Sequence, residues 1–137
     1  EMLSRLELTE PMHLKLIDHC KLRKIHFLST PFDIDSIHLL HRLNLDIIKI
    51  PSGEITNLPY LREIGLLNKK VILSSGMSTI DEIEAAIKVL ELSGTARSKV
   101  TVLHCTTEYP APLREVNLHA MQTIADVLGV SVGYSDH

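Results

Sequence analysis

The sequence predicts an α/β protein with parallel strands, and two features of the chain indicate it. Short runs of branched apolar residues alternate with longer segments whose apolar residues recur at helical spacing. The alternation is strict, which makes the strands parallel and the helices crossover connections between them. The five strands expected from these runs are Ile25–Leu28, Ile47–Ile50, Lys70–Ser74, Lys99–His104 and Val130–Tyr134.

The apolar run 46–50 is the clearest strand and carries one lysine, Lys49. Its branched residues suit a strand that is covered on both faces, and Pro51 ends it because proline has no N–H for a sheet ladder. Lys49 is therefore expected near the carboxyl end of a buried strand, with Ser52 and Glu54 on the following loop. Ligands bind at that edge in parallel α/β folds, and a buried lysine is costly without a partner. The segment predicts an anion site; the alternative is a lysine that extends to solvent.

Capping residues mark where the helices begin and end. Acids in the first turn and a glycine after the last turn are typical of helix termini. The last helix is expected from Val116 to Leu128. The expected caps are Thr9 or Glu10 before Pro11, Asp33 or Asp35, Asn57, and Thr79 with Asp81 and Glu82, and the expected ends are Gly94 and Gly129.

Composition excludes several classes of protein. The 137 residues carry a net charge of −3 with no basic patch, which argues against a nucleic-acid partner. No apolar run is long enough to cross a membrane, and no signal peptide opens the chain. Cys20 and Cys105 are far apart and lack metal-type spacing. We therefore expect a cytoplasmic protein in a reducing compartment, without a membrane partner.

Two architectures fit the alternation, an open doubly wound sheet and a closed barrel. No Gly-x-Gly-x-x-Gly motif follows a strand, which argues against a dinucleotide-binding sheet. Polar residues at every strand end favour the barrel, which needs eight units and about 250 residues when complete. We therefore expect part of a (β/α)8 TIM barrel, about five consecutive β/α units. The polar strand-end residues are Thr30, Lys49, Ser52, Ser74, His104, Thr106, Thr107, Ser135, Asp136 and His137.

Hydroxyl groups together with one lysine form a set of donors suited to phosphate or carboxylate. Glu54 could transfer protons if burial raises its pKa. His137 beside Asp136 could ligate a divalent metal, although a site needs further ligands. His104 lies in a run of valine and leucine, which favours a hydrogen-bonded core histidine, and Cys105 is expected to be a small buried apolar residue.

Five strand-end motifs carry a family resemblance. They are Ser29–Asp33 (STPFD), Lys49–Glu54 (KIPSGE), Ile72–Ser78 (ILSSGMS), Leu103–Pro112 (LHCTTEYPAP) and Gly133–His137 (GYSDH). In this order they resemble the sialic acid synthase family, which comprises N-acetylneuraminate synthase and its legionaminate and pseudaminate relatives. The loop after His104 resembles bacterial members more than animal ones.

The resemblance implies a TIM-barrel enzyme that condenses phosphoenolpyruvate with an N-acetylhexosamine such as N-acetylmannosamine. The products are a nonulosonic acid and phosphate. Thr107 falls at a phosphoenolpyruvate contact where some members have asparagine. The resemblance assigns Lys49 and Ser52 to the phosphoenolpyruvate carboxylate, and Thr30, Ser74 and Ser135 to its phosphate.

The resemblance also implies residues for the sugar and for a metal. Glu54 and Tyr109 match residues that face the sugar, and Glu54 is the candidate for proton transfer. With Lys49, it makes up the expected catalytic pair. His137 matches one of two histidine ligands of a divalent metal, most often Mn²⁺ with Mg²⁺ or Co²⁺ as alternatives. Such a metal would polarise the sugar aldehyde as a Lewis acid.

The same resemblance places residues 1–137 as a partial barrel, from the third to the seventh strand. The first two strands, the last unit and a small C-terminal antifreeze-like domain of the family have no counterpart in it. In the family that domain reaches into the partner's active site, so the full-length protein is expected to be a homodimer. The resemblance implies that the 137-residue chain alone does not catalyse.

Two other functions stay open from the sequence. A Schiff-base aldolase would use Lys49 as a nucleophile and would need neither a metal nor phosphate-binding hydroxyls. A degenerate barrel could instead serve as a non-catalytic interaction module. Intact polar residues at all five strand ends argue against such decay.

Overall fold

The computed structural model describes residues 7–137, and within them four parallel strands form one sheet in the order β1-β2-β3-β4. The strands are β1 (Ile47–Ile50), β2 (Lys70–Ser74), β3 (Val100–Cys105) and β4 (Ser131–Ser135). The helices are α1 (Glu10–Arg23), α2 (Ile34–Arg42), α3 (Leu58–Leu66), α4 (Ile80–Ser93) and α5 (His119–Leu128). Residues 7–137 also form the single 3-10 turns η2 (Ser52–Glu54), η3 (Arg97–Lys99) and η4 (Leu113–Glu115). The α/β class with a parallel sheet is therefore confirmed.

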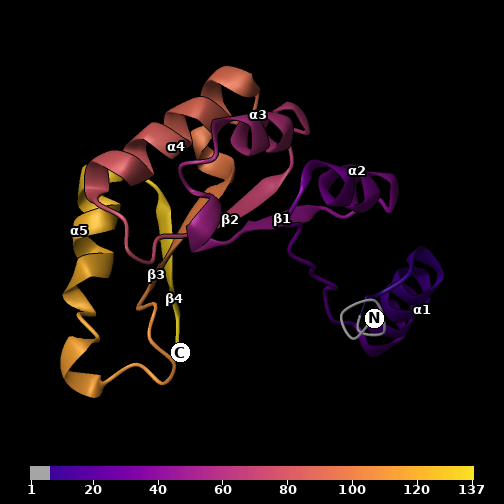
Figure 1. Cartoon of the computed structure of the whole chain (residues 1–137), viewed down its shortest axis with the longest axis horizontal. Coiled ribbons are helices and arrows are strands. Elements are labelled where there is room, and N and C mark those ends of the chain that lie inside the picture. Colours follow the sequence, from indigo (N-terminus) through magenta and orange to yellow (C-terminus); the bar gives the residue numbers. More distant parts are fainter. Residues whose placement is uncertain (1–6) are drawn as a thin grey trace.

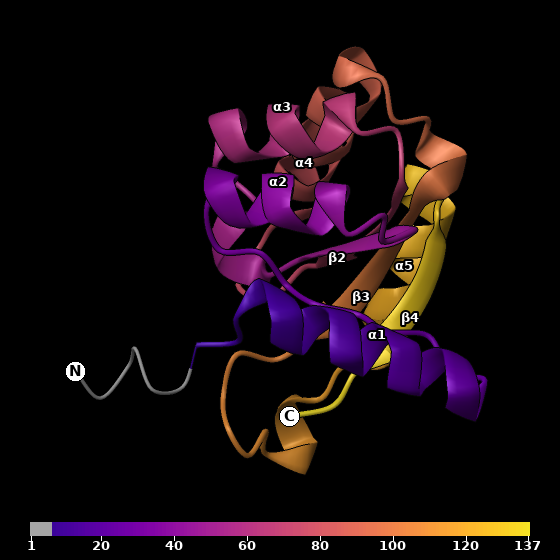
Figure 2. The same ribbon diagram turned by 90° about the vertical axis from the view of Figure 1, so that its right-hand side faces the viewer.

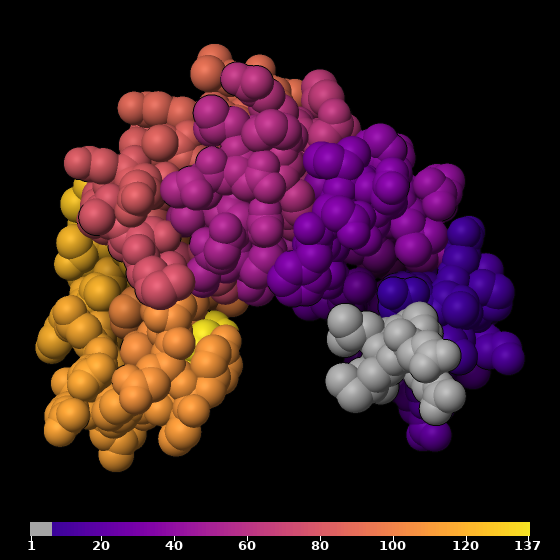
Figure 3. Space-filling view, viewed as in Figure 1, coloured from indigo at the N-terminus to yellow at the C-terminus, as the bar shows by residue number. Residues whose placement is uncertain are grey.

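The helices α2 to α5 cover one face of the sheet, and α1 lies apart from them (Figures 1 and 2). Helices α3 and α4 pack directly against each other on that face. The space-filling view shows the molecule as an arch, and the end of β4 (yellow) reaches its inner side (Figure 3). This curvature, with helices outside and strands inside, is that of consecutive units of a β/α barrel.

The apolar core lies between the sheet and these helices. Ile48 and Ile50 of β1 are fully buried on the helix side, while Ile47 and Lys49 on the other face are only half-buried. The expectation of a strand covered on both faces is wrong for the described residues, because only one face has a helix layer. Lys49 is consequently reachable from the inner side of the arch.

The segment Ile25–Leu28 is not a strand, contrary to the prediction. It is extended, but Ile25 and Leu28 are 60% and 46% exposed, and within residues 7–137 it has no place in the sheet ladder. Its apolar residues are thus not held by strand pairing. The loop after it is fixed instead by a side chain from α3, because the Tyr60 hydroxyl donates a hydrogen bond of 2.7 Å to the Pro31 carbonyl oxygen.

The predicted starts of α1 to α4 are confirmed. Asp33 and Asn57 each accept a backbone N–H of the following turn, and Thr79 forms a reciprocal capping box with Glu82. Thr9 precedes α1, although its side chain makes no capping bond. Within residues 7–137, no helix combines the length and the apolar character needed to span a membrane.

The last helix begins at His119 rather than at Val116. The chain first forms η4 directly after Pro112, and Asn117 then donates its backbone N–H to the Glu115 carbonyl oxygen at 3.0 Å. These turns use local hydrogen bonds in place of the first helical turn, so the helix starts only when they end.

Candidate functional site

The carboxyl ends of the strands bring together side chains that are distant in sequence. Lys49 of β1 reaches across to β2, where its ammonium group donates a short hydrogen bond to the Ser74 hydroxyl. The same group donates to the Ile50 carbonyl oxygen at 3.3 Å. Because β1 and β2 are parallel and adjacent, this pair lies at the edge where the sequence predicted a site.

Lys49 carries a positive charge into a half-buried position. Burial lowers the pKa of Lys49 from its ordinary value, and the proximity of Cys105 partly opposes that shift. Within residues 7–137, no carboxylate forms an ion pair with it. A partly desolvated cation without a protein counter-charge favours the binding of an anionic ligand.

The loop after β2 closes on the turn after β1. The backbone N–H of Gly76 donates to the Ser52 hydroxyl at 2.9 Å, and the Cys105 sulfur lies 3.5 Å from the same oxygen. A Cβ atom at Gly76 would lie 2.5 Å from the Thr107 methyl group and 2.9 Å from the Ser52 oxygen. A side chain does not fit at this position without displacing its neighbours, so glycine is required here. Sequence reasoning missed Gly76, although its place in a Ser-Ser-Gly-Met loop after a strand was a signal.

These bonds decide what the site can still bind. A serine hydroxyl offers one proton and two lone pairs, and an ammonium group offers three protons. Ser74 accepts from Lys49 and Ser52 accepts from Gly76, so both hydroxyls can give their proton to a ligand. Lys49 has used two of its N–H groups inside the protein and keeps one. Each of these three groups therefore keeps a proton to donate, which suits a carboxylate or a phosphate.

The residues after β3 and β4 form a second group beside the first. Nδ1 of His137 makes a short hydrogen bond to the Thr106 carbonyl oxygen, so Nδ1 carries the proton and Nε2 carries the lone pair. Nε2 lies 3.2 Å from the Tyr109 hydroxyl and 3.5 Å from the Ser135 hydroxyl. The Tyr109 ring stacks on the His137 ring with centroids 4.1 Å apart.

This arrangement fits one ligand of a metal site. A ligating histidine commonly donates its other ring N–H to a backbone carbonyl, as His137 does to Thr106. Across residues 7–137, however, no group of three or more His, Cys, Asp or Glu side chains is arranged to hold a metal. His137 can thus contribute Nε2, but a complete ligand set needs side chains beyond the described residues.

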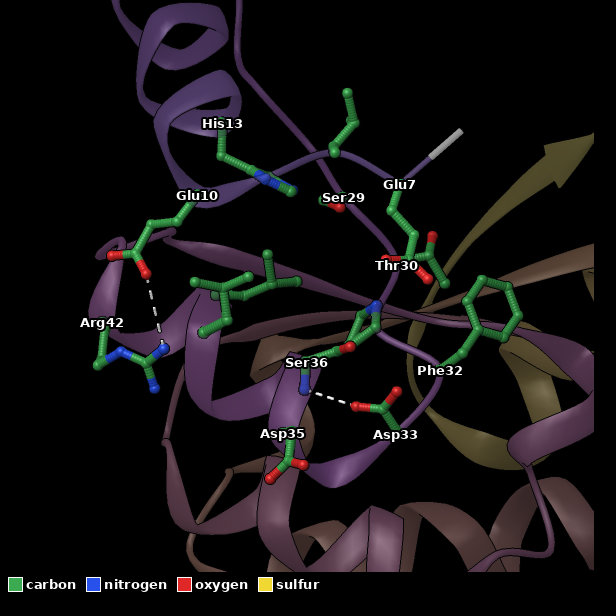
Figure 4. Close-up of a pocket in the computed structure, with 14 residues that line it drawn as sticks. Glu7, Glu10, His13, Ser29, Thr30, Phe32, Asp33, Asp35, Ser36 and Arg42 are labelled. Atoms are coloured by element: carbon green, nitrogen blue, oxygen red, sulfur yellow. Dashed lines mark hydrogen bonds and ion pairs between the residues drawn. The ribbon is translucent and has the colours of Figure 1, made fainter. Parts of the chain in front are cut away.

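Two other predicted residues lie at the margins of this site. Glu54 is half-buried on η2, and its carboxylate accepts a 2.6 Å hydrogen bond from the Asn57 side-chain amide. Thr30 lines a different pocket, formed with Glu7 and Phe32 between the 29–33 loop, α2 and the start of α1 (Figure 4). Within the described residues, no hydrogen bond joins Thr30 to Lys49, and the pocket around Thr30 does not include that lysine.

Two expectations at the end of β3 are confirmed in part: His104 is on the core side and Cys105 is buried, but their polar contacts differ from those expected. His104 lies on the helix side of the sheet, beside Tyr134 at 6.0 Å between ring centroids, so it is not part of the site. Its Nε2 is buried without a hydrogen-bond partner, and burial lowers the pKa of His104. The predicted hydrogen bond is therefore absent from this atom. Cys105 is buried as expected, but its sulfur contacts a polar side chain, Ser52, and faces the site.

A protein-family model described as the NeuB family matches residues 1–137. The chain belongs to the NeuB family. It is 58% identical over 137 residues to the N,N'-diacetyllegionaminic acid synthase of Campylobacter jejuni subsp. jejuni serotype O:2, covering 100% of this chain and 41% of that protein. It is 43% identical over 139 residues to the protein of the same name from Legionella pneumophila, covering 100% of this chain and 39% of that protein.

A solved structure supports the same placement of this NeuB-family chain. The N-acetylneuraminic acid (sialic acid) synthetase of Leptospira borgpetersenii superposes with a TM-score of 0.89 at 32% identity, covering 96% of this chain and 45% of that one. The chain spans about two-fifths of the length of the curated relatives it matches. The resemblance drawn from the five strand-end motifs is confirmed, and the relatives named here are synthases of legionaminic and sialic acids.

Proposed function

We propose that this chain is part of a nonulosonic acid synthase that condenses phosphoenolpyruvate with an N-acetylated hexosamine. In this reaction the methylene carbon of phosphoenolpyruvate bonds to the aldehyde carbon of the sugar. Water is taken up and inorganic phosphate is released. The observation that carries the proposal is the group of donors at the strand ends, where one lysine and two serine hydroxyls each keep a proton for an anion.

Phosphoenolpyruvate matches that group because it carries a carboxylate and a phosphate on one small molecule. Lys49 and Ser52 are assigned to the carboxylate, and Ser74 and Ser135 to the phosphate, whereas Thr30 lies in a different pocket. Ser74 lies within hydrogen-bonding distance of Lys49, so a single anion could contact both side chains. Thr107 lies on the loop after β3, and its methyl group approaches Gly76 of the loop after β2.

The sugar is assigned to Glu54 and Tyr109, with Glu54 as the residue that transfers a proton. His137 would hold a divalent metal, most often Mn²⁺, together with ligands from elsewhere in the protein. When bound, the metal supplies Lewis-acid polarisation of the sugar aldehyde. The higher identity to the two N,N'-diacetyllegionaminic acid synthases than to the Drosophila melanogaster N-acetylneuraminate-9-phosphate synthase (58% and 43% against 30%) favours a 2,4-diacetamido sugar over N-acetylmannosamine.

One observation favours a second candidate, a Schiff-base aldolase. Burial lowers the pKa of Lys49, which raises the share of the neutral amine that such an enzyme needs as a nucleophile. The two candidates differ in their chemistry, because borohydride would trap the carbonyl substrate on Lys49 only in the aldolase. The synthase would instead release phosphate and would lose activity with a chelator.

The test is phosphate release from phosphoenolpyruvate by the complete protein, with N-acetylmannosamine or a 2,4-diacetamido sugar and with Mn²⁺ or a chelator. We expect release that needs both a sugar and the metal. The variant Lys49→Met should abolish it, whereas Lys70→Met, at the exposed opposite end of the neighbouring strand, should not. A folded protein that releases no phosphate with either sugar would refute the proposal, and trapping on Lys49 would then support the aldolase.

A further inference from the structure

Cys105 is a buried side chain at the site that the proposed reaction does not use. It is the last residue of β3 and is 5% exposed, and its sulfur lies 3.5 Å from the Ser52 hydroxyl oxygen. Either atom of this pair can be the donor. Which of them donates decides whether Ser52 can donate to a ligand.

The Gly76 backbone N–H occupies one lone pair of the Ser52 hydroxyl oxygen. It donates to the hydroxyl oxygen at 2.9 Å, which leaves one further lone pair and the hydroxyl proton. If Ser52 gave its proton to the Cys105 sulfur, the hydroxyl would face a ligand only as an acceptor and would repel an anion. If the Cys105 thiol donates instead, both lone pairs are occupied and the hydroxyl proton is free.

Ser74 shows a comparable arrangement at the neighbouring strand end. Lys49 donates to the Ser74 oxygen, which leaves the Ser74 proton free for a ligand. Cys105 lies at the same turn of the site, because a Cβ atom at Gly76 would come within 3.2 Å of its sulfur. The Gly76 backbone N–H and the Cys105 sulfur therefore both lie at the Ser52 hydroxyl oxygen.

We propose that Cys105 is a positioning residue that donates its thiol proton to Ser52 and thereby makes the Ser52 hydroxyl a donor to the anionic ligand. This inference rests on the proposed function, in which that ligand is phosphoenolpyruvate. A sulfhydryl is a weak donor, so the expected contribution to affinity is modest.

The test compares two substitutions that separate hydrogen bonding from volume, made in the complete protein. Cys105→Val fills a similar volume with an apolar side chain that has no donor, whereas Cys105→Ser keeps a donor. We expect Cys105→Val to raise the Kd for phosphoenolpyruvate about three- to tenfold, and Cys105→Ser to stay within about twofold of the unsubstituted protein. Equal affinities of both variants, or a loss confined to Cys105→Ser, would overturn the inference.

A second comparison excludes a merely structural role. In a Ser52→Ala background, Cys105→Val should have no further effect on the Kd, because the group that the thiol orients is gone. An undiminished additional loss would show that Cys105 acts through packing, and would overturn the inference. If the unsubstituted protein binds no phosphoenolpyruvate, the proposed function itself fails; if it binds but the variants do not differ, only the role of Cys105 fails.

Discussion

The ammonium group of Lys49 and the hydroxyl group of Ser74 are hydrogen-bonded across two adjacent parallel strands, although the residues are 25 positions apart. The bond orients both side chains toward the inner side of the sheet. It also explains why a lysine is tolerated at a half-buried position without an ion pair, since part of its hydrogen-bonding capacity is satisfied by a hydroxyl and a carbonyl.

Replacing Lys49 should weaken the binding of phosphoenolpyruvate. Lys49→Met removes the cation that faces the anionic ligand, so we expect the Kd for phosphoenolpyruvate to rise at least about 30-fold, from a loss of roughly 2 kcal/mol or more. The measurement is isothermal titration with phosphoenolpyruvate on the complete protein. Lys70→Met serves as the matched control, and binding that survives Lys49→Met would contradict the assignment.

The effect of Lys49→Met on stability should depend on pH. Because burial lowers the pKa of Lys49 below 10.5, the folded state releases its proton before the unfolded state does. The cost of burying the charge is present below the folded pKa and is relieved as the pH rises toward 10.5. In this alkaline range the free energy of unfolding of the unsubstituted protein should therefore increase relative to that of Lys49→Met. Denaturant melts across the range would measure it, and a constant difference would contradict the shift.

Gly76→Ala should disturb the site because the added methyl group would clash with its neighbours. Its Cβ would lie 2.5 Å from the Thr107 methyl group and 2.9 Å from the Ser52 oxygen. We expect a destabilisation of about 1–3 kcal/mol and weaker binding of phosphoenolpyruvate, because the Ser52 hydroxyl must move. Gly53→Ala is the control, since nothing lies within 4 Å of its Cβ. Similar phosphoenolpyruvate affinities for the two variants would show that the Gly76 contact does not position the site.

His137 should contribute to metal affinity through Nε2. We expect His137→Ala to abolish high-affinity Mn²⁺ binding by the complete protein, measured by electron paramagnetic resonance of free Mn²⁺. His119→Ala, on an exposed position of α5, is the matched control. Unchanged Mn²⁺ affinity in His137→Ala would remove this residue from the ligand set. Activity lost to a chelator should return when Mn²⁺ is added.

His104 should make the fold sensitive to mild acid. Burial lowers the pKa of His104 below 6.5, so the unfolded state takes up a proton that the folded state resists as the pH falls. The free energy of unfolding should therefore decrease below about pH 6.5. We expect His104→Leu to reduce this slope and, because the buried Nε2 lacks a partner, to stabilise the protein at pH 7 by about 1 kcal/mol. His26→Leu, at an exposed position, should leave the slope unchanged.

The 137-residue chain alone should release no phosphate from phosphoenolpyruvate and sugar. Its described residues offer no complete metal-ligand set, and the inner face of the sheet lacks a covering layer. The exposed edge strands and apolar surface should also make it prone to association. Turnover by the purified chain, with the complete protein as the positive control, would contradict this prediction.

Much of the fold followed from local patterns. Thr79 and Glu82 predicted a helix start correctly because a capping box is made by residues three apart, within one turn. The segment Ile25–Leu28 was expected as a strand from its composition and is only extended, since strand formation depends on a partner that local composition does not reveal. His104 and Cys105 were judged by the same apolar run, yet alternation places them on opposite faces of β3.

By itself the sequence determined the α/β class, the parallel order of strands, the strand-end motifs and the family, because each depends on spacing along the chain. Only the tertiary structure decided which of those strand-end residues meet. It paired Lys49 with Ser74, brought Gly76 and Cys105 onto Ser52, and left Thr30 in a separate pocket. The physical reason is that hydrogen bonding is short-ranged and directional, so a shared polar character along the sequence becomes a site only where strand register and loop packing bring the donors within reach.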